Sequence, residues 1–69
     1  MTNTSKVPII LRLYGGYFDQ KGQVDAYERW LTLRGVEFTF MLEDAYSNIP
    51  YVVLMPPNDA TAFKLRFGL

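Results

Sequence analysis

A chain of 69 residues without a single cysteine or histidine has few ways to reach a stable fold. Domains of this size bury a smaller share of their surface than large ones, and many rely on disulfides, a metal or a second subunit. Disulfides and thiolate or imidazole metal sites are impossible here. Hydrophobic residues make up 49% of the chain, which is typical of a globular rather than a disordered protein. We therefore expect one domain over residues 7–69 after a flexible arm (1–6), stabilised by association with a second copy.

The charge balance restricts the partners. Seven basic and seven acidic side chains give a formal net charge of zero. Nucleic acids and anionic membranes are normally bound through a basic excess, so the composition argues against both. No apolar run approaches the ~20 residues of a membrane span, and the polar first residues do not resemble a secretion signal. The expected location is the cytoplasm.

Three segments have the composition and alternation of β-strands: residues 7–14, 36–43 and 50–55. In the first, the odd-numbered residues Ile9, Leu11 and Leu13 share one face. The second alternates most regularly. The third is a continuous apolar run, which favours an interior strand. Between the second and third, residues 44–48 carry the Asp, Ser and Asn side chains that are typical of turns.

Two segments have helical character: residues 19–34 and 59–67. Asp19 is the predicted N-cap of the first helix, and Gly35 the residue that ends it. Asn58 or Asp59 is the predicted cap of the second, with Gly68 as its stop.

The first helix carries more apolar surface than one sheet face requires. It has two adjoining stripes, Val24-Tyr27-Leu31 and Ala26-Trp30-Leu33, and one stripe suffices to cover a sheet. The surplus around Trp30 predicts contact with the second helix or with another chain. In the second helix, Ala60, Phe63 and Phe67 recur at helical spacing and are expected to face the sheet.

This order of elements predicts an α+β fold, β-α-β-β-α, with a three-stranded mixed sheet in the order 1-3-2 and both helices on one face. A right-handed βαβ unit makes the first two strands parallel, and the third fits antiparallel between them. This is a truncated ferredoxin-like plan, in which the outer edge of the first strand is open. Open edges are normally covered, so we expect homodimerisation through this edge or through the Trp30 surface. The alternative is that the N-terminal arm covers the edge.

The sequence contains no strong motif for catalysis or for binding a phosphate or a metal. Gly15-Gly16 lacks the further glycines and the lysine of a phosphate-binding loop, so a structural turn is the preferred interpretation. Asp19, Glu43 and Asp44 are acidic residues near loop ends, and the solvated-turn interpretation is preferred over a magnesium or acid–base site. We therefore predict no enzyme, no cofactor and no metal.

Three further side chains, Arg12, Tyr14 and Tyr51, are candidates for the sheet face opposite the helices. Aromatic residues on such a face bind bases in RNA-recognition domains, and Tyr and Arg are also enriched at protein interfaces. A nucleic-acid-binding module is therefore the alternative to a protein interface.

The end of the chain resembles that of many small proteins encoded by tailed bacteriophages. An acidic-alanine segment, Asn58-Asp59-Ala60-Thr61-Ala62, leads into Phe63-Lys64-Leu65-Arg66-Phe67-Gly68. The resemblance covers about a dozen residues and implies a phage protein in the host cytoplasm, in a group of mostly unassigned role. It transfers no catalytic residue.

Together these features favour a homodimeric protein-interaction module that acts on a host or phage protein. The candidate interface residues are Ile9, Ile10, Leu11, Arg12, Tyr14, Ala26, Trp30, Leu33 and Tyr51.

Overall fold

The computed structural model describes residues 5–42 and 48–69 and has the predicted element order. Strand β1 (Val7–Ile10) is followed by helix α1 (Tyr17–Leu33), strands β2 (Thr39–Leu42) and β3 (Pro50–Met55), and helix α2 (Pro57–Phe67). The sheet order β1-β3-β2 confirms the predicted 1-3-2 arrangement. Both ladders are antiparallel, because β3 lies between β1 and β2 and runs opposite to both. The sheet is therefore antiparallel rather than mixed, although β1 and β2 run in the same direction as predicted.

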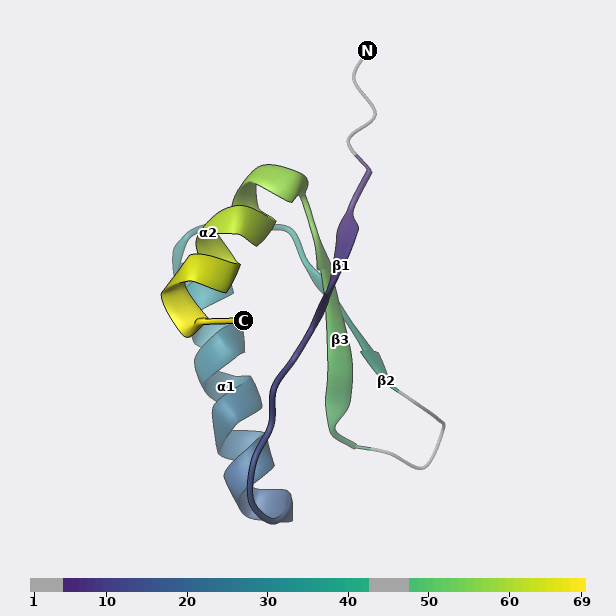
Figure 1. Cartoon of the computed structure of the whole chain (residues 1–69), viewed down its shortest axis with the longest axis vertical. Coiled ribbons are helices and arrows are strands. Elements are labelled where there is room, and N and C mark those ends of the chain that lie inside the picture. Colours follow the sequence, from purple (N-terminus) through teal and green to yellow (C-terminus); the bar gives the residue numbers. More distant parts are fainter. Residues whose placement is uncertain (1–4, 43–47) are drawn as a thin grey trace.

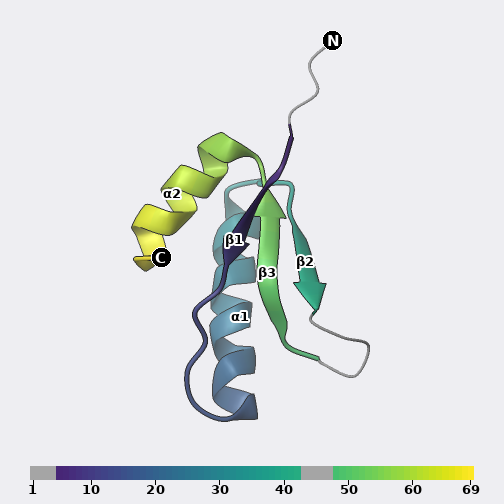
Figure 2. The same cartoon turned by 45° about the vertical axis from the view of Figure 1, so that its right-hand side comes forward.

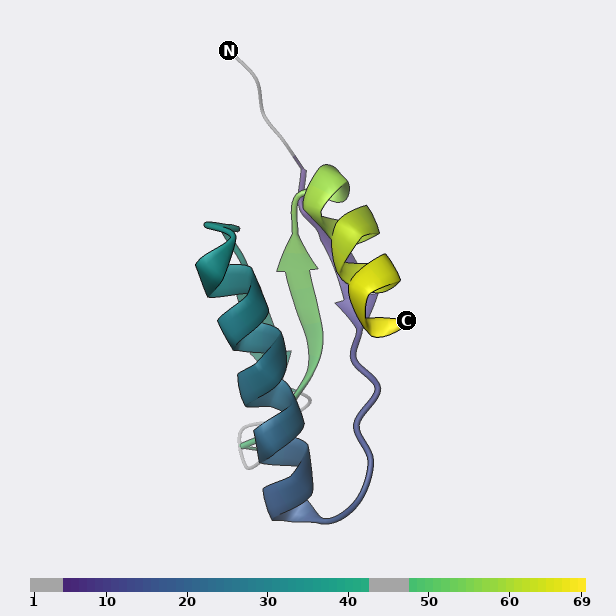
Figure 3. The ribbon, with the colours of Figure 1, turned by 90° about the vertical axis from the view of Figure 1, so that its left-hand side faces the viewer.

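Both helices cover one face of the sheet, as predicted. Figure 1 shows α1 and α2 on the left of the strands, and in the turned view of Figure 2 α1 lies behind β1 while α2 stays on the left. Seen from the helix side in Figure 3, α1 and α2 lie in front of the sheet with β3 visible between them. The largest fully buried side chains, Phe63, Leu31, Met55 and Val53, lie between the two layers.

The core follows the predicted stripes. Val24, Tyr27 and Leu31 are the buried residues of α1, and Ala60 and Phe63 those of α2. Four rings from the two helices pack edge to face or tilted, which links the helices directly: Tyr27, Trp30, Phe63 and Phe67.

Strand β1 is half as long as predicted, because its partner ends. Ile10 pairs with Val52 and the Leu11 amide donates to the Tyr51 carbonyl at 2.9 Å, so Arg12 would oppose Pro50, where β3 begins. β3 has no regular residue before Pro50 to pair with β1, and the chain therefore leaves the sheet after this point and turns toward α1. Strand β2 is also shorter than predicted. Residue 43 of that prediction, and most of the predicted turn over 44–48, lie outside the described residues, as do residues 1–4 of the arm.

Both predicted helix starts are wrong by two residues. Helix α1 is capped by Gly16 rather than by Asp19, because Gly15, at φ +84°, makes the turn that precedes the first helical residue. Helix α2 is capped by Pro56 and begins with Pro57, since proline suits the first helical position, where no N–H is needed. Helix α1 ends at Leu33, one residue before its predicted end, with Arg34 as C-cap and Gly35 at positive φ, while α2 ends at Phe67 as predicted, followed by Gly68 at positive φ.

Candidate interaction surfaces

The outer edge of β1 exposes backbone hydrogen-bonding groups. Because Leu11 bonds to β3, the odd-numbered residues of the strand point their backbone groups inward, and Pro8 and Ile10 point theirs outward. Among the described residues, no backbone bond is made by the Ile10 amide or by the carbonyls of Pro8 and Ile10. Pro8 stands at an outward position, where its missing N–H costs the sheet nothing. The edge is therefore short, but it can pair with another strand.

Beyond the strand, α1 side chains replace the missing strand partner. The Gln23 amide binds Tyr14 twice, accepting from its N–H and donating to its carbonyl, both at 2.8 Å. The Tyr27 hydroxyl donates to the Arg12 carbonyl at 2.9 Å. The helix thus holds the Arg12 carbonyl and both backbone groups of Tyr14, so the edge cannot extend as a regular strand beyond Arg12.

Among the described residues of this border, Tyr27 is an ionisable group whose pKa is shifted from its ordinary value. Burial raises the pKa of its hydroxyl above the ordinary value of 10.0, the neighbouring Tyr14 raises that pKa further, and Arg12 opposes the shift. The buried hydroxyl is therefore held in its neutral, donating form, as its bond to the Arg12 carbonyl requires.

A hollow of about 400 Å³ runs along the same edge. It is lined by Pro8, Ile9, Ile10 and Arg12 from the first strand and its extension, and by Lys64 and Leu69 from the end of the chain. The Arg12 guanidinium donates to the Gly68 carbonyl at 3.3 Å, which ties the end of α2 to this border. The hollow therefore borders the outer edge of β1 on the side of the chain end.

The face of the sheet that the helices do not cover borders the β1 edge. The register places Ile10, Val52 and Met41 in one row across the three strands, on the side away from the helices. Ile10 is 71% exposed and Met41 42%, whereas Val52 between them is only 8% exposed. The exposed apolar side chain nearest the β1 edge is therefore Ile10.

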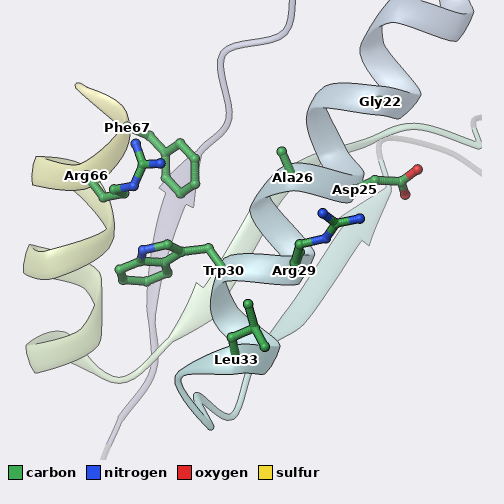
Figure 4. A pocket seen from close by; sticks show the side chains of 8 residues that line it. All are labelled: Gly22, Asp25, Ala26, Arg29, Trp30, Leu33, Arg66 and Phe67. Atoms are coloured by element: carbon green, nitrogen blue, oxygen red, sulfur yellow. The ribbon is translucent and has the colours of Figure 1, made fainter.

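A second hollow, of about 450 Å³, lies between the helices (Figure 4). Trp30 points from α1 toward α2, where Phe67 and Arg66 lie side by side. Ala26 and Leu33 line it from α1, and Leu33 is 79% exposed. The predicted surplus stripe therefore covers no part of the sheet. Trp30 contacts the second helix, as one of the two predictions had it, while Ala26 and Leu33 stay accessible.

Arginines surround this hollow. Arg29 and Arg66 line it, Arg66 lies 5.2 Å from the centre of the Phe67 ring, and Arg34 lies 4.6 Å from that of Trp30. Across residues 5–42 and 48–69, the only ion pair joins Lys6 to Glu37, so none of these arginines is neutralised there.

The structure separates the predicted site residues. The side chains of Ile9 and Leu11 are core, at 6% exposure each, and only Ile10 presents its side chain at the edge. Tyr51 is 44% exposed, and its carbonyl accepts from the Leu11 amide at the point where β2 and β3 lose their regular register. Arg12 and Tyr14 lie beyond the end of β1.

Gly15 and Gly16 lie in the turn before α1, which is the structural interpretation preferred from the sequence. Gly15 needs its positive φ, and its carbonyl accepts from the Gln20 side chain at 2.9 Å. Asp19 lies against Gly15, while Glu43 and Asp44 lie outside the described residues. In the described part of the chain, no group of three metal-ligating side chains comes together.

Sequence reasoning did not identify Arg29, Arg66 and Lys64 as residues that line the two hollows. The available signal was their position, since Arg29 and Arg66 directly precede the aromatic residues Trp30 and Phe67. Neither α1 nor α2 has the length and apolarity that a bilayer crossing needs. No protein-family model matches the chain, and searches of curated proteins and of solved structures return no match.

Proposed function

We propose that this protein is a homodimeric protein-interaction module whose two copies join through the β1 edge. The observation that carries the proposal is the set of outward backbone groups of Pro8 and Ile10, which have no partner among residues 5–42 and 48–69 and lie beside a hollow. Pairing of edge strands is a common way to satisfy such groups. The module binds a partner and catalyses no reaction.

The hydrogen-bonding groups favour one register. In an antiparallel pair centred on Ile10, Ile10 of each copy exchanges two hydrogen bonds with Ile10 of the other, and the Arg12 amide faces the Pro8 carbonyl. The remaining pair in this register would join the Pro8 N–H to the Arg12 carbonyl. Pro8 has no N–H, and the Arg12 carbonyl already accepts from Tyr27, so neither loses a partner.

The neighbouring register is worse. If Pro8 faced Ile10, the Ile10 carbonyl would meet a residue without an N–H and would stay unpaired in the interface, which is costly. Centring the pair on Ile10 also brings the two exposed Ile10 side chains together on the open face and removes them from water.

The interface is small. Stable dimers bury roughly 800 Å² and about 20–30 residues per partner, whereas this edge offers one short strand and the residues beside it. We therefore expect a reversible dimer with a dissociation constant in the micromolar range. The tail resemblance supports a phage origin and action in the host cytoplasm on a host or phage protein.

Sedimentation equilibrium over a concentration series tests the dimer. We expect the average mass to rise from the 8.0 kDa of the monomer toward twice that value. Ile10→Lys places a charge at the two-fold axis and should keep the protein monomeric. Leu65→Lys changes a side chain of similar exposure, 80%, on α2 and should dimerise like the unmodified chain. A constant monomer mass at millimolar concentration, or equal dimerisation of both variants, would refute the proposal.

A further inference from the structure

We propose that the hollow between α1 and α2 binds an acidic peptide segment of another protein, with one large apolar side chain in the hollow and carboxylates against Arg29 and Arg66. This binding site is separate from the β1 edge, since no residue lines both hollows. The inference goes beyond the proposed dimer and does not depend on it.

Small residues on α1 leave open space in the apolar part of the site. Gly22 and Ala26 lie one helical turn apart on α1 and both line the hollow. Apart from the neighbouring backbone of α1, a methyl group at Gly22 would meet no atom within 4 Å, so the space directly beside Gly22 is open. Trp30 and Phe67 form the aromatic wall on the side of α2 (Figure 4). At about 450 Å³ the hollow lies within the 300–1,000 Å³ of ordinary ligand sites.

The charged part of the site selects for anions. Guanidinium groups bind carboxylates through two parallel hydrogen bonds, and they remain charged at any physiological pH. Arg29 and Arg66 lie at the border of the hollow and, in the described part of the chain, neither forms an ion pair. Asp25 is the one acidic lining residue, and its carboxylate points away from α2 (Figure 4). Arg66 therefore makes the α2 side of the hollow positive, whereas the Arg29 guanidinium points away from α2, toward Asp25 (Figure 4).

Charge and size favour a peptide over a nucleic acid. Binding to a phosphate backbone is driven by many cations acting together, whereas this chain has no net charge and the hollow has two lining arginines and one aspartate. One bulky side chain with a carboxylate on either side fits that arrangement. Arg34 covers the Trp30 ring and stabilises the wall against which such a side chain would pack.

Trp30 is the only tryptophan of the chain, so its fluorescence reports directly on the site. The probe is a synthetic 12-residue peptide of alanine and glutamate with one central phenylalanine. The controls are the same peptide with lysine for glutamate and the same peptide with alanine for phenylalanine. We expect a saturable change of Trp30 emission with the acidic phenylalanine peptide, and affinities lower by about fivefold or more with each control. Emission unchanged at millimolar peptide, or equal affinity for the lysine peptide, would overturn the proposal.

Matched variants locate the binding. Arg29→Glu and Arg66→Glu should each lower the affinity for the acidic peptide by about fivefold or more, because the new carboxylate repels those of the peptide. Lys21→Glu, the same reversal on α1 outside the hollow, should leave the affinity within about twofold. Leu33→Glu should weaken binding and Leu65→Glu should not, although the two leucines are almost equally exposed, at 79% and 80%. Retained affinity in both arginine variants contradicts the proposal. The Ile10→Lys variant should bind the peptide normally, which separates this result from that of the dimer.

Discussion

Replacing Gln23 with alanine tests why β1 ends where it does. The Gln23 side-chain amide makes both hydrogen bonds that a neighbouring strand would make to Tyr14, each at 2.8 Å. If these two hydrogen bonds hold residues 12–14 against α1, removing them should free that segment and leave the sheet intact. The helix itself should tolerate the change, since alanine has the highest helix propensity.

The magnitude follows from two hydrogen bonds on a solvent-accessible border. A typical bond contributes about 0.5–1.5 kcal/mol net, and here water can replace both partners. We therefore expect Gln23→Ala to lower the free energy of unfolding by about 1–2 kcal/mol, with the gain in helix propensity offsetting a few tenths. Gln20→Ala is the matched control, since that side chain makes one bond, to the Gly15 carbonyl at 2.9 Å. It should cost about half as much.

Urea denaturation followed by circular dichroism measures the free energy of unfolding, and amide hydrogen exchange measures the local effect. In Gln23→Ala the Tyr14 amide should exchange much faster, while the Leu11 amide, bonded to Tyr51, keeps its protection. An unchanged exchange rate at Tyr14 would refute the reasoning, as would a loss of stability no greater than that of Gln20→Ala.

Two further perturbations address the same border. Because the pKa of Tyr27 is raised by burial in the folded state, its contribution to stability is complete below its ordinary value of 10.0 and is lost as the pH rises through the higher folded value. Tyr27→Phe should lower the free energy of unfolding at neutral pH by about 1 kcal/mol and remove this part of the alkaline loss in pH-dependent urea titrations; an identical alkaline slope in both proteins would contradict it. Gly15→Ala should cost about 1–2 kcal/mol in urea denaturation, because φ is +84° and the new methyl would lie 2.7 Å from an Asp19 oxygen. Gly16→Ala, in extended backbone with no atom within 4 Å, should be tolerated, and equal losses for the two would exclude backbone strain as the cause.

The order of elements could be predicted because each has a clear hydrophobic period and a clear stop. Strand β3 was predicted at its observed bounds, since Pro50 and Pro56 frame a continuous apolar run. Its central place in the sheet followed from that run, as a strand with two neighbours is the most buried. The stripes of α1 and α2 identified the buried side chains for the same reason.

The length of β1 could not be predicted from alternation alone. Period-two patterning reports which face a side chain occupies, whereas a strand ends where its partner ends. The end of β1 depends on its register with β3, in which position 12 meets Pro50. Side-chain bonds such as that of Gln23 to Tyr14 depend on tertiary geometry and leave no periodic signal.

The apolar residues of the candidate surfaces could be predicted from the sequence. Ile10 and Trp30 were identified because each lies on an apolar face that its own strand or helix does not need for covering the core. Arg66 and Phe67 are more than thirty residues away from Trp30 in the sequence, and only the packing of α2 against α1 places them beside it. The positive charge of the hollow therefore emerges from the fold, although each arginine directly precedes an aromatic residue in the sequence.

The position of the two surfaces determines what a dimer would do. The β1 edge lies in the sheet layer, whereas the hollow opens between the helices, and their lining residues do not overlap. Pairing through Ile10 would therefore leave the hollow between α1 and α2 open in each copy, so that one dimer would present two such hollows. A partner with two acidic segments would bind the second at a raised effective concentration, and its overall affinity would exceed that of one hollow by about 10²–10⁴ when its linker spans the distance. Weak binding at a shallow site and weak pairing at a short edge would then reinforce each other, since occupancy of both hollows by one partner holds the two copies together.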